Sequence, residues 1–204
     1  MSTAYDETGR VNQKRRTRDA LVSAAREIVA AGQTPTVEQA AEAAGISRTT
    51  AYRYFTSQRV LLAAAHPETG RASLLPENAS NDPAERLDTV LRTMIERNLE
   101  TEAQQRTMLR LSLEATPEER AQLPLRQGRA IGWISEALSP LGDRMSADEL
   151  HELALAIRAT TGIEALVWLV DVAGLSRSRA AALLRRSGLA LLAQALADSA
   201  ARDR

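Results

Sequence analysis

The stretch TVEQAAEAAGISRTTAYRYF, residues 36–55, constrains the fold more than any other part of the sequence. Its apolar residues recur at helical spacing over two short segments, which predicts helices near 37–44 and 48–55. Gly45 lies between them, and a residue without a β-carbon easily takes the backbone conformation that a tight turn needs. Ser47 can then cap the second helix with its hydroxyl group. Two short helices joined by a turn that contains glycine form a helix-turn-helix.

The rest of the chain is also predicted to be helical. No run alternates apolar and polar residues as a strand does. Several helix starts are marked by a capping residue that stands three positions before Glu or Gln; these are Thr36, Asp82, Thr101, Thr116 and Ser146. We therefore predict an all-α fold of about nine helices. Their expected ranges are 17–31, 37–44, 48–55, 58–65, 83–100, 102–115, 125–138, 147–173 and 177–200.

The composition and the positions of glycine and proline divide the chain into two expected domains. Residues 10–65 form the predicted helix-turn-helix DNA-binding domain. The segment HPETGRASLLPENASN and the residue that follows it read as a loop or linker, 66–82, because glycine, proline and small polar residues gather there. Residues 83–204 form the second domain, for which we expect ligand binding and dimerisation.

Charge and composition narrow the classes of function. Residues 1–65 carry nine Lys/Arg against six Asp/Glu, whereas the whole chain is neutral, so the basic front suits a nucleic-acid partner. The chain has no cysteine, which excludes disulfides, thiolate metal sites and cysteine nucleophiles. Its two histidines, His66 and His151, offer no metal cluster or catalytic triad. We predict no catalytic residue, no metal and no cofactor.

The second short helix has one apolar and one polar face. Ala51 and Phe55 are four residues apart, so both should point into the core. Arg48 and Arg53 then face outward, where an arginine in the major groove can contact guanine. The phenols of the two tyrosines can reach phosphates, and the basic run KRRTR, 14–18, can act as an arm along phosphates or in the minor groove. The predicted DNA-binding residues are Lys14, Arg15, Arg16, Thr36, Ser47, Arg48, Thr49, Thr50, Tyr52, Arg53, Tyr54 and Gln58.

These residues carry a resemblance to a known family. Residues 15–65, with TVEQAAEAAGISRTTAYRYFTSQRVLL and the amphipathic helix before it, resemble the N-terminal domain of TetR/AcrR-type transcriptional regulators. Gln58 departs from the lysine that is common there, which removes one charge from a phosphate contact. Tyr54 stands where histidine is also common. The resemblance implies a dimer, a second domain that encloses a small-molecule pocket, and a fourth helix that transmits its occupancy.

The second half of the sequence supports a dimer but specifies the pocket poorly. The helices near 147–173 and 177–200 have surplus apolar surface, which favours a homodimeric four-helix bundle. One chain that folds this surplus inward is the alternative. Pocket residues are expected among Leu91, Met94, Asn98, Met108, Leu111, Glu114, Trp133, Arg158 and Trp168. Each of them can equally be core, and Trp168 can equally anchor the dimer.

We therefore expect a TetR-like repressor that binds a near-palindromic double-stranded operator as a homodimer and is released by a small organic effector. An activator or a ligand-independent regulator of the same fold, a helical enzyme and a protein-binding scaffold are the alternatives. The N-terminus MSTAYDETGR lacks a secretory apolar core, and the apolar stretch IEALVWLVDVAGL is too short to span a bilayer. A cytoplasmic protein without a membrane partner is thus expected.

Overall fold

The structure is a computed structural model that describes residues 3–65, 72–118 and 129–202, with the side chains of residues 3–10 left out. Within these residues every regular element is a helix and none is a strand, which confirms the predicted all-α fold. His66, part of the predicted linker and the start of the helix predicted at 125–138 lie outside the described residues.

The chain divides into two compact units. The first comprises Met1–Glu68 and Ala103–Leu125, and the second comprises Thr69–Glu102 and Arg126–Arg204. This division groups most of α6 (Glu102–Glu114) with the N-terminal helices, whereas the sequence placed all of 83–204 in one domain. Met108 and Leu111 explain the grouping, because these two buried side chains of α6 form one apolar cluster with Val29 and Leu62.

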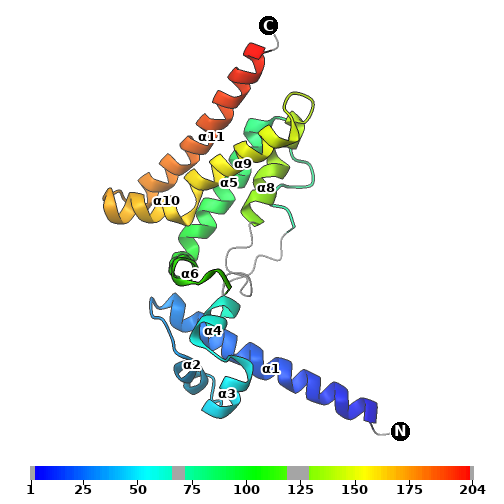
Figure 1. Cartoon of the computed structure of the whole chain (residues 1–204), viewed down its shortest axis with the longest axis vertical. Coiled ribbons are helices and arrows are strands. Elements are labelled where there is room, and N and C mark those ends of the chain that lie inside the picture. Colours follow the sequence, from blue (N-terminus) through cyan, green and yellow to red (C-terminus); the bar gives the residue numbers. More distant parts are fainter. Residues whose placement is uncertain (1–2, 66–71, 119–128, 203–204) are drawn as a thin grey trace. The chain divides into compact units, whose positions relative to one another are not determined.

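Besides most of α6, the first unit contains the helices α1 (Thr3–Ala30), α2 (Val37–Ala43), α3 (Arg48–Tyr54) and α4 (Gln58–Ala65) (Figure 1). Helix α1 packs against α2 and α4, and α2 packs against α3. The core that they share includes Leu21, Ala25, Val37, Ala40, Ala51, Phe55 and Leu61. Leu21 and Ala25 thus bury one face of α1 in this core.

Helix α1 is longer than predicted. It begins at Thr3 rather than near residue 17, so the expected start is wrong. No proline interrupts residues 3–16, and a side chain further along α1 bonds back into the extension, since the Thr17 hydroxyl donates to the Gln13 carbonyl at 3.0 Å. The packed half of α1 already forms a helix, and adding a residue to an existing helix costs much less free energy than starting a new one. The helix therefore extends easily toward Thr3.

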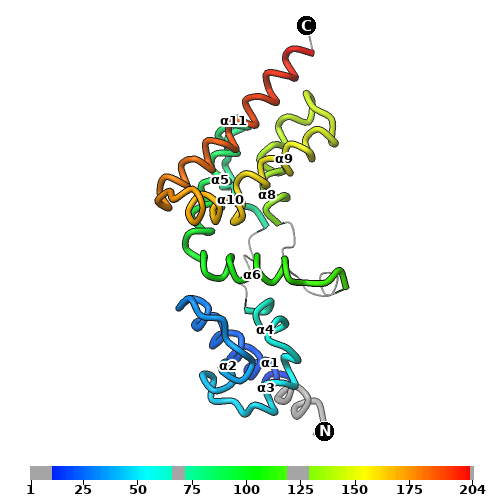
Figure 2. The backbone as a smooth tube through the Cα atoms, turned by 60° about the vertical axis from the view of Figure 1, so that its left-hand side comes forward, coloured from blue at the N-terminus to red at the C-terminus, as the bar shows by residue number. Residues whose placement is uncertain are grey.

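The second unit contains α5 (Pro83–Glu100), α8 (Arg129–Leu138), α9 (Ala147–Thr161), α10 (Ile163–Val167) and α11 (Arg177–Arg202) (Figure 2). Helix α11 packs on α5 and α9, and α8 packs on the same two helices. The start of α5 follows its sequence signals, with Asp82 as the cap and Pro83 at the first turn. Fully buried side chains of this core include Leu87, Leu91, Ile134, Leu138, Ile157 and Leu192.

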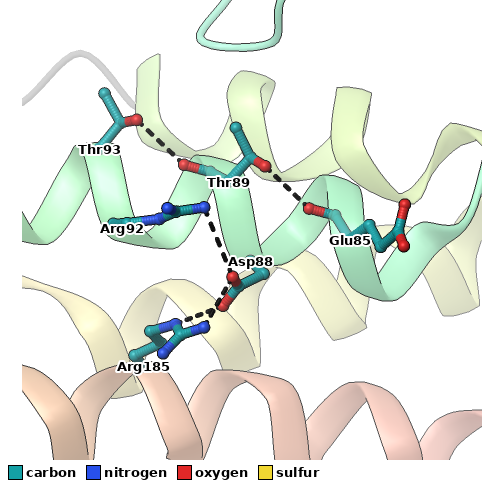
Figure 3. Close-up of polar contacts among 6 residues, drawn as sticks. All are labelled: Glu85, Asp88, Thr89, Arg92, Thr93 and Arg185. Carbon is teal, nitrogen blue, oxygen red and sulfur yellow. Dashed lines mark hydrogen bonds and ion pairs between the residues drawn. The ribbon is translucent and has the colours of Figure 1, made fainter. Parts of the chain in front are cut away.

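An ion pair ties α5 to α11 (Figure 3). The Arg185 guanidinium donates to both carboxylate oxygens of Asp88, with Nη2 2.7 Å from Oδ2, and Arg92 adds a contact at 3.6 Å. These hydrogen bonds from Arg185 lower the pKa of Asp88. The hydroxyls of Thr89 and Thr93, in contrast, donate to carbonyls of their own helix. Asp88 and Arg185 therefore form a polar link between these two helices.

The single helix predicted at 147–173 is interrupted, so that prediction is wrong. Gly162 has φ −81° and ψ 178°, an extended conformation that separates α9 from α10. Arg158 and Glu164 form an ion pair of 3.2 Å, and a β-carbon on Gly162 would lie 1.7 Å from Arg158 Nη1. The pair thus packs directly over the glycine. A π-helical turn, η2 (Trp168–Val172), completes the segment.

Two segments of the described chain are long and apolar enough to cross a membrane by length and composition, whereas the sequence led us to expect none. They are Ala147–Val172 and Arg177–Arg202, with mean hydropathies of 1.6 and 1.2. Core helices of globular proteins meet the same criterion, so the indication is weak. The first segment is moreover broken at Gly162.

Candidate nucleic-acid interface

The first turns of α2 and α3 are fixed by caps that the sequence predicted. Thr36 and Gln39 form a capping box, in which the Thr36 hydroxyl accepts from Gln39 N and the Gln39 side chain accepts from Thr36 N at 2.8 Å. The Ser47 hydroxyl accepts from Thr50 N at 3.3 Å and lies 2.9 Å from Thr50 Oγ1. Gly45 takes φ +65°, as the turn requires. Both helices therefore have defined starts and a tight connection.

Helix α3 buries one face and exposes the other. Ala51 and Phe55 are 0% and 1% exposed. Arg48, Thr49 and Arg53 lie on the exposed surface, and the side chain of Arg48 is 74% exposed. Tyr52 is also exposed, and Ser47 with half-buried Thr50 borders this surface. Four of the predicted residues of α3 are thus brought together on one accessible helix face; these are Arg48, Thr49, Tyr52 and Arg53.

Glu38 on α2 belongs to the same surface, although the sequence analysis did not select it. Its Oε1 accepts a hydrogen bond from the Tyr52 hydroxyl at 2.6 Å and lies 3.0 Å from Arg48 Nη2. The Arg48 guanidinium also lies 5.8 Å from the centroid of the Tyr52 ring. The bond from Tyr52 lowers the pKa of Glu38, and the same bond raises the pKa of Tyr52. A charged carboxylate therefore joins α2 to α3 here.

The two tyrosines of α3 have different surroundings. A phenol has one hydrogen to donate, and Tyr52 donates it to Glu38. Tyr54 is half-buried and packs against the core of the first unit, as Ile46 and Val60 also do. Within residues 3–65, 72–118 and 129–202 its hydroxyl makes no hydrogen bond. Tyr54 therefore has a donor available for a phosphate. The phosphate contacts of both tyrosines remain predictions, and that of Tyr52 requires that its hydroxyl leave Glu38.

Gln58 is engaged inside the first unit. Its amide nitrogen donates to the carbonyl oxygens of Pro35 at 3.0 Å and Thr34 at 3.5 Å. These bonds tie the start of α4 to the loop before α2. The phosphate contact of Gln58 remains a prediction, and it requires that the amide leave these carbonyls.

The basic run 14–18 lies within helix α1, whereas we had expected most of it to precede the first helix; its contact with DNA remains a prediction. Lys14, Arg15 and Arg16 are exposed on α1. Arg18, one turn beyond Lys14, places its guanidinium 5.6 Å from the centroid of the Phe55 ring at the end of α3. Arg18 therefore marks the side of α1 that is turned toward α3.

The expected pocket residues are not brought together in one unit. Met108 and Leu111 pack in the first unit, whereas Leu91, Met94 and Trp133 are buried in the second. The remaining four are half-buried or exposed. Asn98 is half-buried, Glu114 pairs with Arg110 at 3.6 Å, Arg158 pairs with Glu164, and Trp168 is 58% exposed. Among the described residues no group of His, Asp and Glu is placed to hold a metal ion.

Comparisons with known proteins agree with this architecture. No protein family model matches the chain, and no curated protein matches it. Among solved structures it is similar to a TetR transcriptional regulator from Rhodococcus sp. RHA1, with a TM-score of 0.58 and 20% sequence identity. The match covers 89% of this chain and 98% of the other. The chain therefore has the fold of a TetR transcriptional regulator.

Proposed function

We propose that the chain is a transcription regulator that reads double-stranded DNA with α3. The carrying observation is the division of α3 into a buried face with Ala51 and Phe55 and an exposed face with Arg48 and Arg53. An exposed arginine can bind O6 and N7 of guanine together, which is worth about 1–3 kcal/mol of discrimination. The likeness to a TetR transcriptional regulator supports this role rather than catalysis. In this proposal residues 10–65 form the DNA-binding domain.

We further propose that the chain acts as a homodimer through residues 147–173 and 177–200. The outward side of α11 supports this, because it carries a row of exposed small residues that would allow a second helix to approach closely; these are Ala182, Ala190, Ala193 and Ala197. The exposed Trp168 and Val172 add apolar surface nearby in the chain. A two-fold pair of α3 helices would then read half-sites about 34–36 Å apart in a near-palindromic operator.

We propose that the protein is cytoplasmic and that it represses transcription while it is bound to DNA. A small organic ligand would release it from the DNA and so relieve the repression. The expected site is in residues 83–204, where buried Leu91, Met94 and Trp133 can supply apolar walls. Ligand binding would change the separation of the two α3 helices, which requires a coupling of about 1–3 kcal/mol. Screening small organic molecules for release of bound DNA tests this step, and deletion in the cell should raise transcription of the target.

Selection of bound duplexes from a random pool tests the DNA-binding proposal. We expect a two-fold symmetric sequence, with an affinity that falls as salt rises, because phosphate contacts release counterions. Arg48→Ala and Arg53→Ala should relax the preference at individual base pairs. Arg179→Ala, an exposed arginine of the second unit, is the matched control. Failure of the protein to bind any duplex in dilute salt would refute the proposal.

A further inference from the structure

We propose that Glu38 is a specificity-determining residue, which positions Arg48 and Tyr52 on the DNA-facing surface so that Arg48 reads one base pair. This inference depends on the proposed DNA-binding function and assigns a role that none of the predicted contact residues has. Glu38 is a positioning residue, because it acts through the side chain of Arg48.

The geometry links three side chains through one oxygen atom. Oε1 of Glu38 receives the Tyr52 hydroxyl at 2.6 Å and lies 3.0 Å from Arg48 Nη2. Arg48 and Tyr52 are four residues apart on α3, so both lie on the same helix face. Val37, which precedes Glu38, and Ala51, which precedes Tyr52, are buried in the core that α2 and α3 share. The backbones on both sides of the cluster are therefore fixed.

Glu38 orders Arg48 without covering it. A guanidinium has five N–H donors; Glu38 contacts the nitrogen Nη2 of Arg48, and a further hydrogen bond joins Arg48 to Tyr52. The Arg48 side chain remains 74% exposed. The other donors can thus bind a base while the side chain is already held in place. A flexible arginine would have to lose its freedom on binding, and preorganisation removes that part of the unfavourable entropy.

The charge of Glu38 has a second effect, which lowers the affinity for DNA of any sequence. A carboxylate on a DNA-facing surface is repelled by phosphates, and this repulsion acts on every sequence alike. Glu38 should therefore weaken binding to unrelated DNA while it strengthens the preference for the correct base pair. These two effects together predict a distinct behaviour for variants at this position.

The test compares Glu38→Ala, Glu38→Gln and Tyr52→Phe in the full chain. The matched control is Glu42→Gln, which removes the same charge from an exposed position one turn further along α2. For each protein the dissociation constant is measured for the selected duplex and for duplexes with single base-pair changes. Circular dichroism during thermal unfolding shows whether each variant folds.

We expect Glu38→Ala to bind unrelated DNA more tightly. Its discrimination at one base pair should fall by a factor of about ten, which lies within the range that one arginine contact supplies. Glu38→Gln, which keeps an acceptor for Tyr52, should lose less. Tyr52→Phe should reduce the same discrimination. A protein with both Glu38→Ala and Tyr52→Phe should lose less discrimination than the sum of the two single losses, because the residues act as one unit. Glu42→Gln should raise the affinity for all duplexes by the same factor and keep the preference for the selected sequence.

Two results separate the inference from the function on which it depends. If the unmodified protein binds no duplex, the proposed function and this inference are both wrong. If it binds selectively and Glu38→Ala retains the full preference, only the inference is overturned. An equal loss of preference in Glu42→Gln overturns it as well, since a general charge effect then suffices. Should Glu38→Ala not fold, Glu38→Gln and Tyr52→Phe decide by the same criterion.

Discussion

Gly188→Ala in α11 offers a quantitative test of the packing in the second unit. In the middle of a helix this change should stabilise by about 1 kcal/mol, because alanine has the better helix propensity. At Gly188, however, the new β-carbon would lie 2.7 Å from Leu91 Cδ1 and 3.2 Å from Thr161 Cγ2. Leu91 and Thr161 are both fully buried, so neither side chain can move away into solvent.

Overpacking of a buried site typically destabilises by about 1–3 kcal/mol. With the gain in helix propensity subtracted, Gly188→Ala should lower the free energy of unfolding by between zero and about 2 kcal/mol. Gly132→Ala in α8 is the matched control, because a β-carbon there meets no atom within 4 Å. The control should raise the free energy of unfolding by about 1 kcal/mol.

Urea unfolding followed by far-ultraviolet circular dichroism measures both variants at one protein concentration. The difference between them isolates the steric contact with Leu91 and Thr161. We expect Leu91→Val to reduce that difference in the Gly188→Ala background, since it removes the nearest methyl group. A Gly188→Ala protein as stable as the Gly132→Ala protein would refute the close packing of α11 against α5 and α9.

Three further outcomes are expected. Tyr54→Phe should weaken binding to every duplex by the same factor in a filter-binding titration, because a lost phosphate contact carries no base information; a loss confined to the selected duplex contradicts this. Arg185 holds the pKa of Asp88 below its ordinary value of 3.8, so the stability that this pair contributes is present above that pH and declines as the pH falls below it. Asp88→Asn should remove this decline from urea unfolding midpoints, and an unchanged pH profile rejects the assignment. Ala193→Arg should convert the proposed dimer to a folded monomer in sedimentation velocity, and an intact dimer rejects the interface on α11.

The sequence predicted the helices whose starts depend on local caps. Thr36, Ser47, Asp82 and Ser146 each accept a hydrogen bond from the first turn of their helix, as their positions indicated. Gly162 could not be recognised as a break, because the ion pair that packs over it forms only in the folded chain. The start of α1 was missed because residues 3–16 contain no proline, so the helix continues beyond its packed part.

The candidate interface was also predicted only in part, because its local features can be read from the sequence and its contacts between helices cannot. The periodicity of α3 separates Ala51 and Phe55 from Arg48 and Arg53 without any tertiary information. The partnership of Glu38 with Tyr52 joins residues that are fourteen positions apart on two helices. It depends on the angle between α2 and α3, which no spacing in the sequence specifies. The pocket residues were hardest to predict, because buried methionine and tryptophan look the same in a core and in a binding site.

The helical start of α1 limits how far the basic run can reach. A helix rises about 1.5 Å per residue, so Lys14 and Arg18 are separated by about 6 Å along the axis, against about 14 Å in an extended chain. Successive side chains also turn by about 100° around the axis, which directs Lys14, Arg15 and Arg16 to three different sides. If this run contacts DNA as we propose, one strand would meet only part of its charge, and the remainder would act through long-range attraction.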